Sequence, residues 1–126
     1  MIYSKPSTHS PEEIADRLAQ AVARHKFGIL HVLDLRQTLQ NKGIQLGSDC
    51  RVYDVCNPHA AAAALRADMR VSAVLPCRIS VFTQPGGSLI STVLPFDLFA
   101  ATGLQGAEDL AAEVQRELIA IIDETA

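Results

Sequence analysis

Residues Val52–Phe82 read VYDVCNPHAAAAALRADMRVSAVLPCRISVF, and this stretch contains the signals for a strand, a helix and a second strand. CRVYDVC, residues 50–56, predicts the first strand. Asn57 is a favoured N-cap residue and Pro58 suits the first helical position, so NPHAAAAALRAD predicts the helix. AVLPCRISVF, residues 73–82, alternates with the period of a strand. The two strands therefore place Cys56 just before the helix and Cys77 just after a Leu-Pro pair.

Two longer helices are predicted on either side of this unit. SPEEIADRLAQAVARHKFG, residues 10–28, has Ser10 as N-cap, Glu13 to complete a capping box, and Gly28 beyond its end. GAEDLAAEVQRELIAIIDETA, residues 106–126, has an apolar stripe at helical spacing and acids in its first turn. Both patterns indicate amphipathic helices that bury one face.

The remaining segments predict shorter elements. IYS, residues 2–4, suggests a short first strand, and GILHVLDL, residues 28–35, is apolar on both faces, as is typical of a central strand. LRQTLQNKG, residues 35–43, predicts a short helix ended by Gly43. Pro85 and Gly86 suit a type II turn that joins residues 73–82 to a hairpin partner at 89–94. PFDLFAATG, residues 95–103, predicts an irregular or one-turn segment.

These elements predict a single α+β domain over residues 1–126. Two long helices and one or two short helices pack on a mostly antiparallel sheet of about five strands. If the helices cover only one face of that sheet, its other face needs a second copy of the chain or a ligand cavity to bury apolar side chains. Either self-association into a dimer or a ligand cavity is therefore expected.

Composition excludes several classes of function. Apolar residues make up 48% and charged residues 20%, which predicts a folded domain. The net charge of −3, with basic residues scattered, predicts no nucleic-acid partner. The apolar runs are too short to span a bilayer, and the start has no export signal, so a cytoplasmic location is expected. The odd number of cysteines, three, favours reduced thiols over a disulfide framework.

Cys56 and Cys77 are the candidate catalytic residues. The N-terminus of the predicted helix would stabilise a Cys56 thiolate and lower its pKa. The frequent burial of free cysteines favours the alternative, that Cys56 is a small apolar residue that closes the strand. Cys77 shares its strand face with Ile79 and Val81, which predicts that it points into the core. Arg78 then points the other way and could hold a carboxylate, or it is a solvated charge.

Asn57, His59 and Arg78 are candidate ligand-binding residues. Cys56 and His59 have a spacing compatible with chelation, but adding Cys50 and Cys77 matches no common zinc pattern, so no metal site is predicted. His31 lies in an apolar run and is more typical of a core histidine than of a ligand. The nucleotide-binding and hydrolase motifs GxGxxG, GxxxxGK[ST], GxSxG and HExxH do not occur, and no cofactor is expected.

YDVCNPHAAAAALRAD followed by LPCRISVF, with a hairpin ending in Leu94-Pro95, resembles the prokaryotic family called domain of unknown function 302. The pattern that carries the resemblance is Cys56-Asn57-Pro58 together with Leu75-Pro76-Cys77-Arg78. The resemblance implies a compact α+β fold with helices packed on a curved antiparallel sheet, commonly associated as a homodimer. No activity of the family is settled.

Three functional hypotheses follow. The first, which favours a non-enzymatic role without excluding an activity, is a homodimeric binding or interaction module with a small pocket near the two motifs for a small anionic or apolar ligand. The second is a thiol-dependent sulfur-transfer or redox protein with Cys56 as thiolate, Cys77 as its resolving partner and Arg78 holding an anion. A metal or haem carrier is a weaker third.

Overall fold

One antiparallel sheet with strand order β1-β5-β4-β3-β2 organises the molecule. The computed structural model describes all of residues 1–126. The predicted α+β class is confirmed. In chain order the elements are β1 (Ile2–Ser7), α1 (Pro11–Arg24), β2 (Gly28–Asp34), α2 (Leu35–Gln40), β3 (Cys50–Cys56), α3 (Pro58–Ala67), the 3₁₀ helix η1 (Met69–Val74), β4 (Cys77–Gln84), β5 (Gly87–Val93), α4 (Pro95–Ala101) and α5 (Glu108–Thr125).

The strand–helix–strand unit forms as predicted, with an added 3₁₀ helix. Strands β3 and β4 are antiparallel neighbours, with Val55 opposite Cys77. The side-chain oxygen of Asn57 accepts hydrogen bonds from the amides of His59 at 3.1 Å and Ala60 at 3.2 Å, which confirms the N-cap. The sequence did not predict η1, which Asp68 starts by accepting a hydrogen bond from the Arg70 amide.

The hairpin of β4 and β5 turns at Pro85 and Gly86. Gly86 has φ +87°, the positive value that the third residue of a type II turn requires, so the predicted turn is confirmed. The next residue, Gly87, has φ +154°, and a Cβ there would lie 2.0 Å from the backbone oxygen of Ser7. Only glycine lets the hairpin approach β1 this closely.

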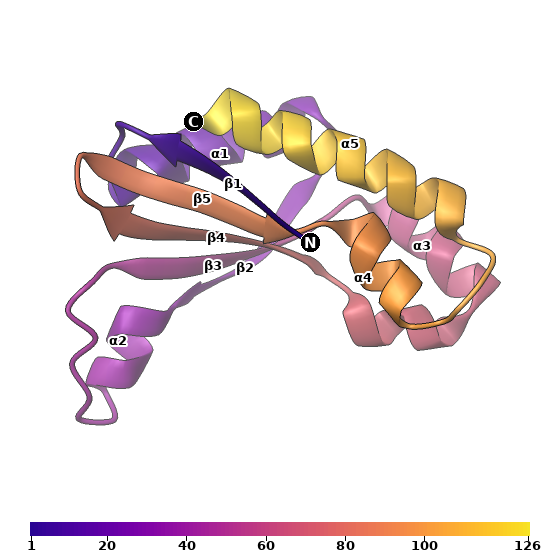
Figure 1. Ribbon diagram of the computed structural model, residues 1–126, viewed down its shortest axis with the longest axis horizontal. Helices are drawn as coiled ribbons and strands as arrows, with labels where there is room; N and C mark the ends of the chain where they lie inside the picture. Colours follow the sequence, from indigo (N-terminus) through magenta and orange to yellow (C-terminus); the bar gives the residue numbers. More distant parts are fainter.

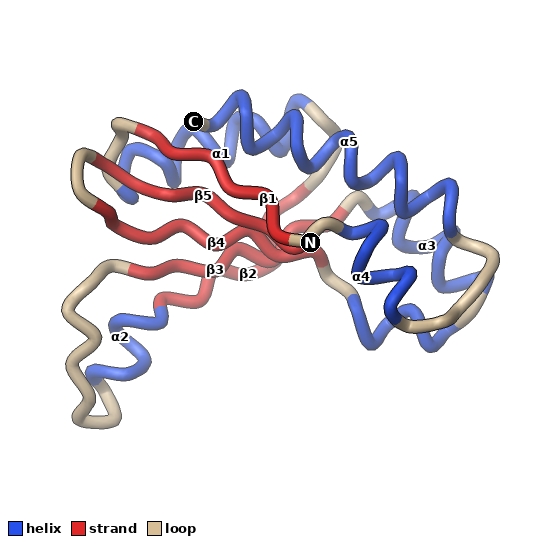
Figure 2. The backbone as a smooth tube through the Cα atoms, in the orientation of Figure 1, coloured by secondary structure: helices blue, strands red, loops and turns tan.

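Helices α1 and α5 cover one face of the sheet (Figures 1 and 2). The predicted capping box of α1, formed by Ser10 and Glu13, is present. Inward-facing residues of both helices and of the central strands bury the main core. Its members are Ile14, Leu18, Ala21, Val22, Phe27, Tyr53, Val55, Ile79, Val81, Ile90, Leu118, Ile121 and Ile122.

Three predicted elements differ from the structure. Strand β2 lies at the edge of the sheet, not at its centre, and a register shift between Ile29 and His31 leaves Leu30 64% exposed. Because β2 is apolar on both faces, the sequence predicted a central strand buried on both faces. In the structure β2 pairs with β3 alone, so it is an edge strand. Strand β1 extends to Ser7 because it pairs along the whole of β5. Residues 95–101 form the regular helix α4 in place of an irregular segment.

The opposite face of the sheet has no long helix over it (Figure 1). The short helix α2 has no buried residue. It joins β2 to β3, and together with the loop that leads to β3 it extends away from this edge of the sheet (Figure 1). None of the helices combines the length and the apolar composition that crossing a membrane requires.

Candidate ligand cavity

A second, smaller group of helices packs beside the end of the sheet. Helix α3, η1, α4 and the first turns of α5 come together there (Figure 2). Ala64, Val71, Phe99 and Ala107 are its buried residues, and Val74, Leu75, Leu104, Leu110 and Ala111 pack against them. The alanine-rich α3 presents small side chains, which let backbones approach closely. This group of helices is called the small lobe below.

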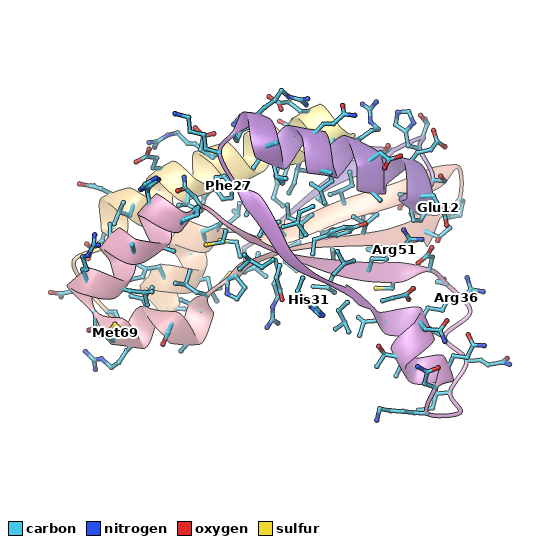
Figure 3. All side chains as sticks on the ribbon, turned by 180° about the vertical axis from the view of Figure 1, so that it is seen from behind. Glu12, Phe27, His31, Arg36, Arg51 and Met69 are labelled. Atoms are coloured by element: carbon cyan, nitrogen blue, oxygen red, sulfur yellow. The ribbon has the colours of Figure 1, made fainter.

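A cavity of about 380 Å³ lies between the small lobe and the end of the sheet. Of the 22 residues that line it, 18 are hydrophobic. Strands β3 and β4, helices α3, α4 and α5, and η1 all contribute to its wall. Phe27, the residue before β2, lines the cavity on the side of the small lobe, whereas the exposed Met69 lies at the outer end of that lobe (Figure 3). Arg78 supplies the one charge in the lining and Asn57 the one amide.

The structure brings four of the five candidate site residues together. Cys56, Asn57, Cys77 and Arg78 all line the cavity. The fifth, His59, is exposed on α3 and does not line it. The helix directs residue 59 away from the lobe, whereas Ala60, Ala61 and Ala64 face the cavity.

Cys50 lies at the far end of β3, about 20 Å from Cys56 for a strand of this length. The next residue, Arg51, lies at the same end of β3 and forms an ion pair with Glu12 of α1 at 3.1 Å (Figure 3). No group of three or more His, Cys, Asp and Glu side chains is placed to hold a metal ion. The residues considered as metal ligands, Cys50, Cys56, His59 and Cys77, therefore do not converge.

Cys77 points inward, as the alternation of its strand predicted. Its side chain packs against the main core beside Val55, its cross-strand partner. Burial, and to a smaller extent the charge of a Cys56 thiolate, raise the pKa of the Cys77 thiol to about 11. Cys77 is therefore a neutral thiol near neutral pH.

The predicted lowering of the Cys56 pKa is wrong. Burial raises the pKa of this thiol above its ordinary value. The helix N-terminus does not offset burial, because the amides of His59 and Ala60 already donate to the Asn57 side chain. No basic side chain forms an ion pair beside the thiol either, so the site lacks the usual means of stabilising a thiolate.

Arg78 points away from the core, also as predicted, and it is not a free charge. Its Nε lies 3.6 Å from Asp54 Oδ1, and the other oxygen of Asp54 lies 3.7 Å from His31 Nδ1. These three residues are cross-strand partners on β4, β3 and β2. His31 is 62% exposed, so the core position expected for it is wrong, because β2 is an edge strand.

Sequence reasoning did not identify the far wall of the cavity. Pro95, Leu98 and Phe99 come from the region of α4, and Leu110 and Val114 come from α5. The apolar stripe of α5 predicted that Leu110 and Val114 are inward-facing, but no local signal shows that this part of the helix faces a cavity and not the sheet.

The fold and the cavity define a single-sheet α+β protein with its long helices on one face and an apolar cavity beside the sheet. The chain belongs to the family described as domain of unknown function DUF302, whose model matches residues 3–125, and this confirms the resemblance carried by the two motifs. It is similar to the crystal structure of an uncharacterized conserved protein DUF302 from Bacillus stearothermophilus, with a TM-score of 0.94 and 26% identity. That match covers 99% of this chain and 98% of the other. A comparison with curated proteins finds no match.

Proposed function

We propose that this protein is a homodimeric binding module that holds a small ligand in the cavity between the sheet and the small lobe. The observation that supports it best is that the Cys-Asn-Pro and Leu-Pro-Cys-Arg motifs line one cavity. Its volume of about 380 Å³ and its largely hydrophobic lining are typical of small-molecule sites. The family pattern thus lies where a ligand would bind.

The uncovered face of the sheet supports the dimer. Tyr53, Val81 and Ile90 are buried beneath α1 and α5, so the alternate residues of their strands lie on the opposite face. An apolar stripe crosses that face, formed by two cross-strand pairs that are only partly buried: Leu33 with Val52, and Phe82 with Leu89. A twofold interface places one patch against itself, and the stripe is uncharged, although Asp54, Arg78 and His31 lie on the same face of the sheet.

One observation favours the thiol-dependent alternative, namely that Cys56 and Cys77 line the same cavity. Two others weigh against it. Burial raises the pKa of both thiols. The cross-strand partner of Cys77 is Val55, whereas Cys56 pairs with Gly28 of β2, so the two cysteines do not occupy directly opposed positions of neighbouring strands. A Cys56–Cys77 disulfide or a persulfide in the purified protein would support this alternative over binding.

Native mass spectrometry of the purified protein tests the proposal. We expect a dimer that retains a non-covalent small molecule and loses it on collisional activation. The Ala61→Phe variant, which fills the cavity, should lose the retained molecule. Ala62→Phe on the same helix should keep it, because Ala62 does not line the cavity. Equal retention by both variants would contradict a site in this cavity.

A second pair of variants tests the interface. Val52→Lys places a charge in the apolar stripe and should convert the dimer into monomers. Thr83→Lys adds the same charge at an exposed position of β4 and should leave the dimer intact. A dimer in both variants would place the interface elsewhere, and a monomeric wild type would overturn the dimer.

A further inference from the structure

We propose that the cavity selects neutral apolar ligands against anionic ones, and that Asp54 sets this selection by pairing with Arg78. This inference rests on the proposed binding function and adds the chemical class of the ligand. It also assigns a role to Asp54, a residue that does not line the cavity itself.

The N-terminus of α3 has no free amide to offer an anion. Pro58 lacks an N–H group, and the amides of His59 and Ala60 both donate to the side-chain oxygen of Asn57. The Ala61 amide donates to the backbone oxygen of Asn57 at 2.9 Å. The donors that would make a helix N-terminus an anion site are thus already used.

The thiols contribute no charge either. Cys56 and Cys77 are both free cysteines, and burial keeps them protonated near neutral pH. The remaining wall is largely aliphatic, from Ala60 and Ala61 on α3 to Leu98 and Leu110 across the cavity. An anion placed there would lose its hydration without gaining hydrogen bonds, and this opposes its binding.

Arg78 is the one group in the lining that could offset this cost, and Asp54 already compensates its charge. The guanidinium Nε lies 3.6 Å from Asp54 Oδ1. Its side chain is 73% exposed, so it lies at the solvent side of the wall and not at its centre. An anionic ligand would have to compete with Asp54 for this guanidinium and would also meet the carboxylate as a like charge.

The volume sets the size of the ligand. An apolar cavity of roughly 150 Å³ holds benzene. At about 380 Å³, this cavity is about two and a half times as large. It has room for two or three aromatic rings, or for an aliphatic molecule of similar bulk, within one protomer.

A matched pair of fluorescent probes tests the selection. N-phenyl-1-naphthylamine is neutral, and 8-anilinonaphthalene-1-sulfonate adds one sulfonate to the same skeleton. Titration of the wild-type dimer should show one neutral probe bound per protomer, with at least tenfold higher affinity than the sulfonate. Ala61→Phe should abolish binding of the neutral probe, and Ala62→Phe should retain it.

Substitution of Asp54 tests its role. In Asp54→Asn, Arg78 loses its partner, so affinity for the sulfonate should rise at least threefold while that for the neutral probe stays within twofold. Asp54→Glu keeps the charge and should keep the wild-type selectivity. Adding Arg78→Gln to Asp54→Asn should remove the gain. Asp16→Asn, which removes a charge from the exposed side of α1, should change neither affinity.

The outcomes separate this inference from the proposed function. Equal or tighter binding of the sulfonate in the wild type would overturn the selection while leaving the binding function in place. Unchanged sulfonate affinity in a folded Asp54→Asn protein would overturn the role of Asp54. If neither probe binds, or if both bind equally to Ala61→Phe and Ala62→Phe, the binding function at this cavity fails as well.

Discussion

Local sequence rules predict the side-chain direction of Cys77 but not the pKa of Cys56. Strand alternation placed Cys77 correctly, because the side-chain direction along a regular strand is fixed by parity. The same kind of local rule failed for the pKa of Cys56. Free amides are the strongest means by which a helix N-terminus stabilises an anion, and here the side chain of Asn57 already accepts from the amides of His59 and Ala60.

The raised pKa of Cys77 predicts slow alkylation in the folded protein. With a pKa of about 11, its thiolate fraction at pH 8 is on the order of one in a thousand. Iodoacetamide labelling followed by peptide mass spectrometry should show Cys77 modified at least tenfold more slowly than the same residue in urea. Its rate should keep rising to pH 10. Rapid labelling of folded protein at pH 8 would contradict the burial of this thiol.

At the scale of single elements, the cap of α3 gives a testable stability effect. Asn57→Ala removes the acceptor of two amide hydrogen bonds and should lower the free energy of unfolding by about 1 kcal/mol. His59→Ala, on the same turn but exposed, should change it by less than about 0.5 kcal/mol. Urea denaturation of both variants measures the difference. Equal effects would mean that the cap contributes little.

Elements whose signals are local were predicted closely, and those fixed by distant partners were not. Strand β3, helix α3 and the turn at Pro85 and Gly86 each contain their own starting or ending residues. Strand β2 was misplaced because its position at the edge depends on which strands pair with it. The cavity could be predicted only on its motif side, since its far wall comes from α4 and α5, roughly 20 to 60 residues further along the chain.

At the scale of the whole molecule, His25 links the two helices that cover the sheet. It follows α1, and its ring nitrogens face two carboxylates of α5, Glu117 at Nδ1 and Glu124 at Nε2, the latter at 2.8 Å. Carboxylates only accept hydrogen bonds, so both contacts require the charged imidazolium. Glu124 and then Glu117 accordingly raise the pKa of His25 above its ordinary value.

This link should make stability depend on pH. A raised pKa in the folded state means that the contribution of His25 is complete below its unfolded pKa of about 6.5 and is lost as pH rises through the folded value. Wild type should therefore exceed His25→Gln in unfolding free energy by more at pH 6 than at pH 9. His59→Gln, which removes an exposed histidine that forms no ion pair, is the matched control. A gap between wild type and His25→Gln that is constant with pH would contradict the link.

The two apolar clusters differ in size, and this predicts uneven stability across the molecule. The main core contains 13 buried residues and the small lobe contains 4. Local opening is easiest where few apolar contacts are buried, so amides of α3 and α4 should exchange with deuterium at least tenfold faster than those of β4. Saturating neutral probe should slow exchange in the lobe and leave β4 unchanged, because the ligand would bridge the lobe to a sheet that is already stable. Equal amide exchange rates in α3, α4 and β4 of the free protein would show that the two clusters unfold as one unit. The cavity between them would then be a rigid site that a ligand enters without local opening.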